Sequence, residues 1–375
     1  MIGFNKPYLS GNELKYIADS VATKKISGDG LFTNKCHSFF EAKYGFKKVL
    51  LTTSCTDALE MAAILLDIKE GDEIIAPAYT FVSTVNAFVL RGAKIIFADS
   101  MGKNPNMDAD KIESLITKKT KVIIPVHYAG IACDMDKIMD LADKYNLFVV
   151  EDAAQAIDSY YKEKPLGSIG HLAAFSFHET KNIISGEGGM LVINDDRFIE
   201  RAEIIREKGT NRSQFFRGEV DKYGWVDIGS FFLPSDIIAA FLYAQLENIE
   251  NIQGKRKEIW NRYYNLLKPL KKSGIQLPEI PEKATNNAHM FYLVCNSLTE
   301  RTNLIESLKA KGITSVFHYI SLNKSAYYKS ISSNHTDMYE SDRYTNCLVR
   351  LPMYYELSLT EIDTVAESIL SFFRL

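Results

Sequence analysis

The chain has 375 residues and a formal net charge of −3, from 44 basic and 47 acidic side chains that are mixed throughout the sequence. This length predicts two domains, or one large α/β domain with an appendage, and an apolar fraction of 46% suffices for a sizeable core. Because the charges are mixed, the sequence shows no basic patch that would bind nucleic acid or a membrane. An anionic ligand would therefore need a local basic site.

The cysteines and the hydropathy pattern narrow the class of protein further. Five cysteines are scattered and never form a CxxC pair, which argues against a disulfide framework and a zinc site. The N-terminal segment lacks a basic stretch followed by an apolar one, and no window approaches eighteen uncharged apolar residues. We therefore expect a cytoplasmic protein without signal peptide, membrane span or metal.

The first 45 residues are expected to form an arm and a helix. Residues 10–13 offer a helix start, and Leu14, Ile17 and Val21 follow with helical spacing. Residues 28–33 then predict a turn. They lack the spacing of a dinucleotide site, and a simple connector is the plain interpretation.

The next two segments each predict a strand that leads into a helix. Strand 49–53 precedes a helix that opens at residues 54–57, and strand 73–77 precedes a helix that follows residues 79–83. The first N–H groups of a helix can bind a phosphate, although residues 54–57 are equally an ordinary N-cap. An aromatic residue within 79–83 could stack on a flat ring or simply belong to the core.

Strands and helices continue to alternate as far as residue 206. Strands are predicted at 94–99, 122–126, 147–152, 172–177 and 190–194, and helices at 111–116, 136–146 and 196–206. This alternation predicts an α/β fold with a mostly parallel sheet covered by helices on both faces. His127 is expected to be structural. Beyond the last helix, a basic cluster (Arg206, Lys208, Arg212, Arg217) is either a solvated face or a contact for a diphosphate.

The last third of the chain predicts a smaller α+β domain. An apolar helix runs from Asp236 past Leu246, and a longer charged helix should end near Lys268 because Pro269 follows. A strand at 290–294 and helices at 304–311 and 362–373 come next. The predicted domains are therefore residues 1–245 and 246–375.

Two residues at strand ends carry the chemical hypothesis. Asp152 ends the strand at 147–152, and Lys181 lies just past the strand at 172–177. A lone lysine in a polar loop is ordinarily a surface residue, but ligands of open α/β sheets bind at the carboxyl ends of the strands. A lysine and a carboxylate at that edge suit pyridoxal phosphate, with the lysine forming a Schiff base and the acid holding the pyridine nitrogen protonated. Gln155, one helical turn past Asp152, is placed to touch the ring or its hydroxyl.

Residues 71–84, 151–155 and 176–182 resemble the sugar-nucleotide aminotransferases of the DegT/DnrJ/EryC1/StrS family, and the resemblance covers nearly the whole chain. Residues 177–182 and 206–218 are most similar to family members that make dTDP-4-amino-4,6-dideoxygalactose. The resemblance implies a pyridoxal phosphate-dependent transferase of fold type I, with pyridoxamine phosphate as the intermediate form. It also implies a dTDP-linked 4-keto sugar and L-glutamate as substrates, and a homodimer with shared active sites.

The resemblance further assigns roles to residues. Lys181 and Asp152 are the expected catalytic residues. The cofactor would contact a further set that comprises Ser54, Cys55, Thr56, Phe81, Gln155 and Ser176, with Tyr79 as the substitute for Phe81. Gly28, Arg212 and Tyr319 would contact the substrate. Residues 229–234 depart from the family pattern where many members carry an asparagine that reaches a partner's cofactor phosphate, and Ser230 is the candidate to replace it.

Several alternatives remain open at this stage. The same reaction class could give the gluco epimer or a 3-amino sugar. A related 3-dehydratase has histidine where this chain has Lys181, which argues against that activity. A catalytically silent sugar-nucleotide-binding regulator is the alternative outside enzymes.

Overall fold

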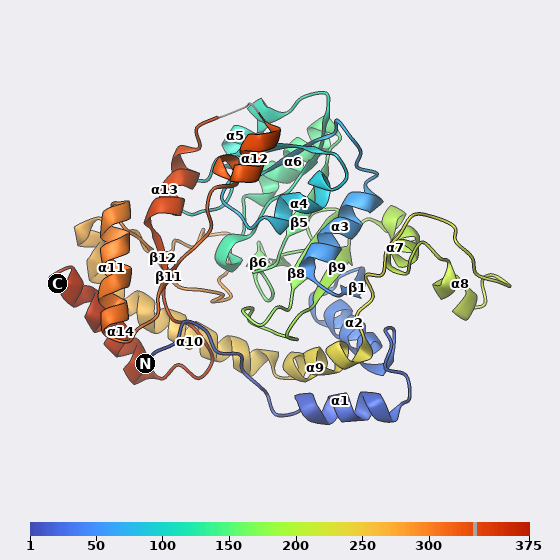
Figure 1. Ribbon diagram of the computed structural model, residues 1–375, viewed down its shortest axis with the longest axis horizontal. Helices are drawn as coiled ribbons and strands as arrows, with labels where there is room; N and C mark the ends of the chain where they lie inside the picture. Colours follow the sequence, from blue (N-terminus) through green and yellow to red (C-terminus); the bar gives the residue numbers. More distant parts are fainter. Residues whose placement is uncertain (333–335) are drawn as a thin grey trace.

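A seven-stranded sheet forms the centre of the computed structural model, which describes residues 1–332 and 336–375 (Figure 1). Its strands are β1 (Lys48–Thr52), β2 (Glu73–Pro77), β3 (Lys94–Ala98), β4 (Thr120–Ile123), β5 (Phe148–Asp152), β8 (Leu172–Ser176) and β9 (Gly189–Ile193). They lie in the order β1-β9-β8-β5-β4-β2-β3. β9 is antiparallel to β1 and β8, and the other neighbouring pairs are parallel. The prediction of a mostly parallel sheet is confirmed, and each strand overlaps its predicted segment.

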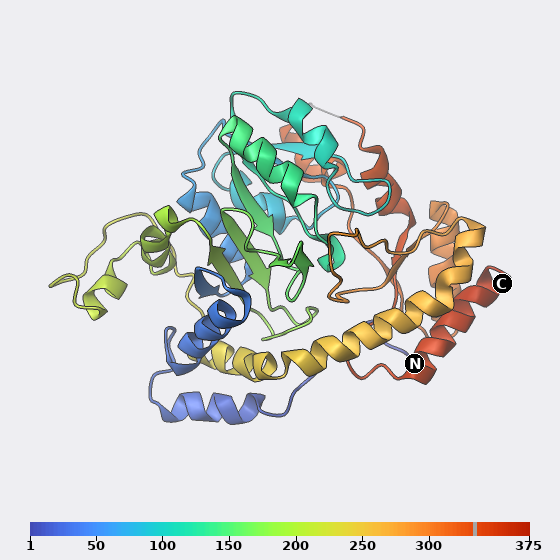
Figure 2. The same cartoon turned by 180° about the vertical axis from the view of Figure 1, so that it is seen from behind.

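Helices cover both faces of this sheet, because successive strand residues point to opposite sides. Leu50 packs in one core with α3 (Cys55–Leu65), α4 (Ser83–Val89) and α7 (Ile199–Arg206). Leu51 packs in the opposite core with α2 (Leu31–Tyr44), α6 (Met135–Tyr145) and α9 (Asp236–Glu247). Figures 1 and 2 show the two layers from opposite sides. The doubly covered α/β architecture predicted from the sequence is confirmed.

A third core, in the second part of the chain, lies around a three-stranded antiparallel sheet in the order β10-β12-β11. The strands are β10 (Tyr292–Val294), β11 (Val316–Phe317) and β12 (Leu348–Arg350). The helices of this part are α10 (Ile249–Leu267), α11 (Leu298–Ala310), α12 (Ala326–Ile331), α13 (Tyr339–Cys347) and α14 (Leu359–Phe372). Ile2 forms a bridge with Ile313, so the N-terminal residues lie with this second part. The division of the chain near residue 246 stays a prediction.

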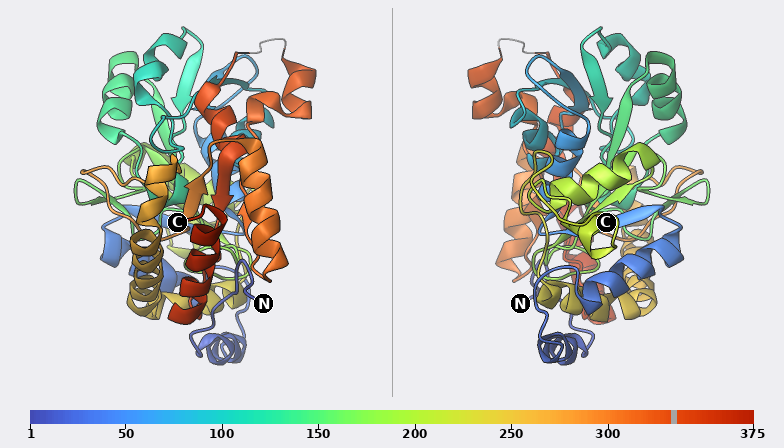
Figure 3. Two further views of the ribbon diagram at one scale, coloured as in Figure 1. Left: turned by 90° about the vertical axis from the view of Figure 1, so that its left-hand side faces the viewer. Right: turned by 90° about the vertical axis from the view of Figure 1, so that its right-hand side faces the viewer.

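The remaining elements are short or lie at the periphery. They are α1 (Glu13–Ala22), α5 (Ala109–Ile112), α8 (Arg212–Phe216), the pair β6 (Tyr160–Tyr161) and β7 (Lys164–Pro165), and five 3₁₀ turns: η1 (Glu113–Leu115), η2 (Tyr128–Gly130), η3 (Asp196–Phe198), η4 (Lys268–Ser273) and η5 (Leu322–Lys324). α8 projects away from the body of the molecule. α1, in blue, lies at the lower edge of the molecule in both views of Figure 3. Of the helices within 1–332 and 336–375, none combines the length and hydropathy needed to cross a bilayer.

The turn predicted for residues 28–33 is only partly present, because α2 already begins at Leu31. The side chain that satisfies the first N–H groups of α2 comes from far along the chain. The buried Asp236 carboxylate accepts hydrogen bonds from the backbone N–H of Phe32 (3.3 Å) and of Thr33 (2.8 Å), and from the Ser20 hydroxyl (3.0 Å). One carboxylate thereby joins α1, α2 and α9, and no local capping residue signals the helix.

We predict that Asp236→Ala lowers the free energy of unfolding by about 3 kcal/mol, because it leaves several buried donors without an acceptor. Urea unfolding followed by circular dichroism measures this change. Glu367→Ala is the matched control, since Glu367 is an exposed carboxylate on α14. Equal stabilities of the two variants would contradict the role assigned to Asp236.

Candidate active site

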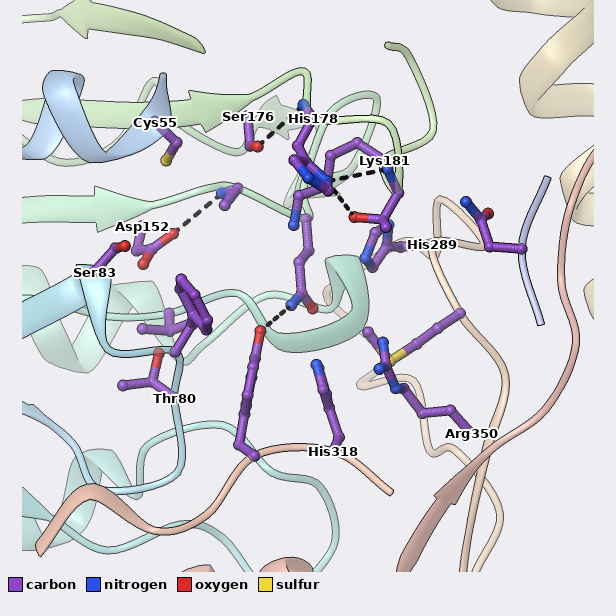
Figure 4. Close-up of a pocket in the computed structure, with 18 of the residues that line it drawn as sticks. Cys55, Thr80, Ser83, Asp152, Ser176, His178, Lys181, His289, His318 and Arg350 are labelled. Atoms are coloured by element: carbon purple, nitrogen blue, oxygen red, sulfur yellow. Dashed lines mark hydrogen bonds between the residues drawn. The ribbon is translucent and has the colours of Figure 1, made fainter. Parts of the chain in front are cut away.

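A cavity of about 650 Å³ opens at the carboxyl ends of β5 and β8. Its walls come from both parts of the chain: Asp152 and Lys181 from the large sheet and its loops, His289 and Arg350 from the second part, and Phe4 from the N-terminal segment. Figure 4 shows these labelled side chains, apart from Phe4, around a common space. The cavity lies where ligands of open α/β sheets bind.

Asp152 is the last residue of β5 and is 6% exposed. Its carboxylate accepts hydrogen bonds from the Thr84 hydroxyl (2.6 Å) and from the backbone N–H of Ala154 (3.2 Å). Burial raises the pKa of Asp152, while these two hydrogen bonds and the charge of Lys181 oppose the rise. The carboxylate is thus fixed in orientation and supported in its ionised form.

Lys181 lies in the loop between β8 and β9, and its backbone N–H donates to the carbonyl of His178 (2.9 Å). Burial lowers the pKa of Lys181, and the positive charge of Arg350 acts in the same direction, whereas Cys55 and Asp152 oppose it. Within the described chain the ammonium group makes no hydrogen bond or ion pair. A half-buried amine with a lowered pKa is suited to form a covalent bond with a carbonyl and to carry protons.

The N-terminus of α3 forms the far wall of the cavity. Ser54 caps this helix by accepting a hydrogen bond from the N–H of Asp57 (3.1 Å), and the N–H groups of Cys55 and Thr56 find no acceptor among residues 1–332 and 336–375. Gly189 allows the approach of β9, because a Cβ there would lie 2.4 Å from the Cys55 nitrogen. With Ser176 also lining the cavity, this wall offers a phosphate a set of free donors and the positive end of a helix.

Of the residues predicted to contact the cofactor ring, some line the cavity and one lies in the core. Phe81 lines the cavity and is 55% exposed, so its ring is free to stack on a ligand. Tyr79 is buried in the third core, and its hydroxyl donates to the carbonyl of His318 (3.3 Å). The Gln155 oxygen accepts from the Ala129 N–H (2.6 Å), and its nitrogen donates to the Tyr319 hydroxyl (3.0 Å). Gln155 and Tyr319 therefore enter the cavity as a connected pair.

Two residues predicted to contact the substrate do not line the cavity of this chain. Gly28 packs against Leu233, where an added Cβ would lie 2.3 Å from that side chain. Arg212 begins α8 and forms an ion pair with Glu207 at 2.5 Å. The roles given to these two residues stay predictions. His127 does not line the cavity either, and it forms a buried pair with Glu151 at 2.9 Å.

Apart from Tyr319, sequence reasoning assigned no role to the cavity residues of the second part and the N-terminus, which include Phe4, Asn5, Arg256, His289, His318 and Arg350. The only signal was a polar residue beside a predicted strand, as at His289 before the strand at 290–294. Two arginines, Arg256 and Arg350, line the cavity together with Lys181 and the carboxylates of Asp152 and Glu187. The arginines suit an anionic ligand.

The residues fit pyridoxal phosphate. The free N–H groups of α3 suit its phosphate, the oriented carboxylate of Asp152 suits its ring nitrogen, and the unpaired amine of Lys181 suits its aldehyde.

Comparisons with known proteins agree with this fit. The profile of the DegT/DnrJ/EryC1/StrS aminotransferase family matches residues 7–370. GDP-perosamine synthase of Caulobacter vibrioides is 34% identical over 83% of this chain and 83% of that protein. Spr1654 of Streptococcus pneumoniae, named as a sugar aminotransferase, has been solved in a PMP form and a PLP form. The PMP form has a TM-score of 0.92 and the PLP form one of 0.90, each at 27% sequence identity. Both comparisons cover 100% of this chain, with 99% of the PMP-form chain and 98% of the PLP-form chain.

The family match spans nearly the whole chain, and the cavity holds a lysine, a carboxylate and a phosphate cradle in one place. The chain belongs to the DegT/DnrJ/EryC1/StrS aminotransferase family and is a pyridoxal phosphate-dependent sugar aminotransferase.

Proposed function

We propose that the enzyme transfers the amino group of L-glutamate to C4 of dTDP-4-keto-6-deoxy-D-glucose. The product is dTDP-4-amino-4,6-dideoxy-D-galactose, a precursor for cell-surface polysaccharide. The observation that carries the proposal is the cavity of about 650 Å³ that Lys181 and Asp152 share, which Arg256 and Arg350 also line. The similarity of residues 206–218 to enzymes that make this amino sugar supports the choice of substrate.

The cofactor, when bound, supplies an electron sink that stabilises negative charge on the carbon losing a proton. Lys181 would hold the cofactor before the half-reaction with the donor and, once released, would move a proton at the donor's α-carbon. In the half-reaction with the sugar, the free Lys181 would move a proton at C4. Its lowered pKa favours the neutral amine that accepts such a proton. Asp152, oriented by Thr84 and Ala154, would keep the ring nitrogen protonated.

The aminotransferase is proposed to work as a homodimer whose active sites are completed by the partner chain. Large apolar side chains are exposed along the segment around α8, including Phe216 (69%), Trp225 (84%) and Phe231 (55%). Figure 1 shows this segment extending away from the rest of the chain. A second copy covering these side chains would explain their exposure, and it would bring Arg212 and Ser230 toward a neighbouring site.

Light scattering coupled to size-exclusion chromatography should give twice the chain mass of 42.4 kDa at micromolar concentration. Trp225→Glu should shift the mass toward that of the single chain, because it places a charge in the proposed interface. Glu367→Gln, on the exposed side of α14, serves as the control. A fully active wild-type monomer would contradict the proposal.

The cytoplasm is the proposed compartment. All five cysteines are free thiols, and four of them are buried, in agreement with a reducing environment.

The Thr84 hydroxyl provides a test of the role of Asp152. Thr84→Val removes a hydrogen bond that lowers the pKa of Asp152, so the carboxylate should lose its charge at a higher pH. We predict that the acid limb of the pH–rate profile moves up by about one pH unit, with Thr84→Ser leaving it in place because the hydroxyl is retained. Identical profiles for Thr84→Val and the wild type would reject this role.

The substrate assignment is tested by incubating the enzyme with dTDP-4-keto-6-deoxy-D-glucose and L-glutamate and assigning the product by NMR. The proposal predicts a 4-amino sugar whose proton coupling constants show the galacto configuration. Lys181→Ala should give no product, which controls for uncatalysed amination. A gluco product, a 3-amino sugar or no reaction by the wild type would each contradict the proposal.

A further inference from the structure

Arg350 is a cation that lines the cavity. It forms no ion pair with any carboxylate in residues 1–332 and 336–375, and its Nε is buried without a hydrogen-bond acceptor. The other arginine of the cavity, Arg256, differs, because it donates to the carbonyls of Ala288 (3.1 Å) and His289 (2.7 Å). A guanidinium is always charged, and a buried N–H such as that of Arg350 Nε is costly unless a ligand supplies an acceptor.

The fold holds Arg350 in a defined position. It ends β12, the middle strand of the second sheet, and pairs there with Tyr292 on one side and Val316 on the other. Its guanidinium lies 4.8 Å from the centre of the Phe4 ring. Phe4 is held in turn, since its carbonyl accepts from the N–H of Met353 (3.2 Å). The guanidinium is therefore oriented before any ligand arrives.

Arg350 acts on the end of the cavity where the chemistry occurs. Its charge contributes to the lowered pKa of Lys181, and Figure 4 shows it beside His289 and His318. Burial lowers the pKa of both histidines, so these neighbours are neutral. The charge of Arg350 is therefore left unbalanced on this wall.

We propose that Arg350 binds the α-carboxylate of the amino donor. This inference rests on the proposed function, because it takes L-glutamate as the donor. The donor's nitrogen must reach the cofactor carbon held by Lys181, and the α-carboxylate is attached to the same carbon as that nitrogen. It must therefore lie close to the reacting atoms, where Arg350 offers a planar pair of donors. The keto sugar has no charge near C4, since its diphosphate lies beyond the sugar ring.

The test uses the glutamate half-reaction alone, followed by the loss of visible absorbance as the holoenzyme converts to its amine form. We compare L-glutamate with L-isoglutamine, in which the α-carboxylate is a neutral amide, and with L-glutamine, in which the γ-carboxylate is. Arg350→Gln should lower the second-order rate constant for L-glutamate by about 100-fold and should change that for L-isoglutamine by less than about threefold. The penalty for L-glutamine relative to L-glutamate should stay as in the wild type.

Two further variants sharpen the result. Arg350→Lys should recover part of the rate with L-glutamate, because it restores the charge without the planar donor pair. Arg262→Gln is the control for loss of an arginine, since Arg262 pairs with Asp363 on the surface.

Equal losses with L-glutamate and L-isoglutamine would overturn the proposal in favour of a structural role, and an unchanged L-glutamate rate would overturn it outright. A loss confined to the half-reaction with the amino-sugar nucleotide would assign Arg350 to the diphosphate instead. A wild type that reacts with the amino sugar but with none of the three amino acids would overturn both this inference and the glutamate part of the proposed function. Failure of the sugar assignment alone would leave the test intact, because it needs no sugar.

Discussion

The register between β5 and β8 is the constraint on which the site depends. These neighbouring parallel strands pair Asp152 with Ala174, so β8 continues only two residues beyond the level of Asp152 before the loop that carries Lys181 begins. A carboxylate and an amine are thereby placed at one buried edge, where each would be costly alone. Thr84 and the Ala154 N–H stabilise the carboxylate. The Lys181 amine has no such partner in the described chain, so it is available for covalent chemistry. A slip of β5 by one residue would turn the Asp152 side chain to the opposite face of the sheet.

The sequence predicted the parts of the fold in which local pattern and tertiary structure agree. The strands of the large sheet are short apolar runs, and α3 has its own cap in Ser54. α2 was mistaken in part for a turn because its cap, Asp236, lies 204 residues from Phe32. The pair β6–β7 and the helices α8, α12 and α13 were missed since they are short and have little apolar periodicity.

Most of the candidate site could be predicted where it follows the βα pattern, and Tyr319 of the second part was predicted from the family resemblance. Lys181, Asp152 and Thr56 stand at strand or helix ends of the large sheet, so position in the pattern suggested them, whereas Ser176 was suggested by the family resemblance. Arg350 and His289 come from the second part, and no local pattern shows that this sheet turns its edge toward the first. The contribution of Arg350 is electrostatic, because its positive charge helps to lower the pKa of Lys181. The large sheet is thus proposed to supply the cofactor contacts, while the second part supplies the charge proposed to bind the α-carboxylate of the donor.

The central claim is that Lys181 and Asp152 hold opposite ends of one flat ring. A crystal structure of the holoenzyme tests it most directly. The account predicts electron density that continues from the Lys181 Nζ into the cofactor, with the Asp152 carboxylate within hydrogen-bond distance of the ring nitrogen and the phosphate at the N-terminus of α3. A cofactor bound elsewhere, or a ring nitrogen facing a group other than Asp152, would contradict it.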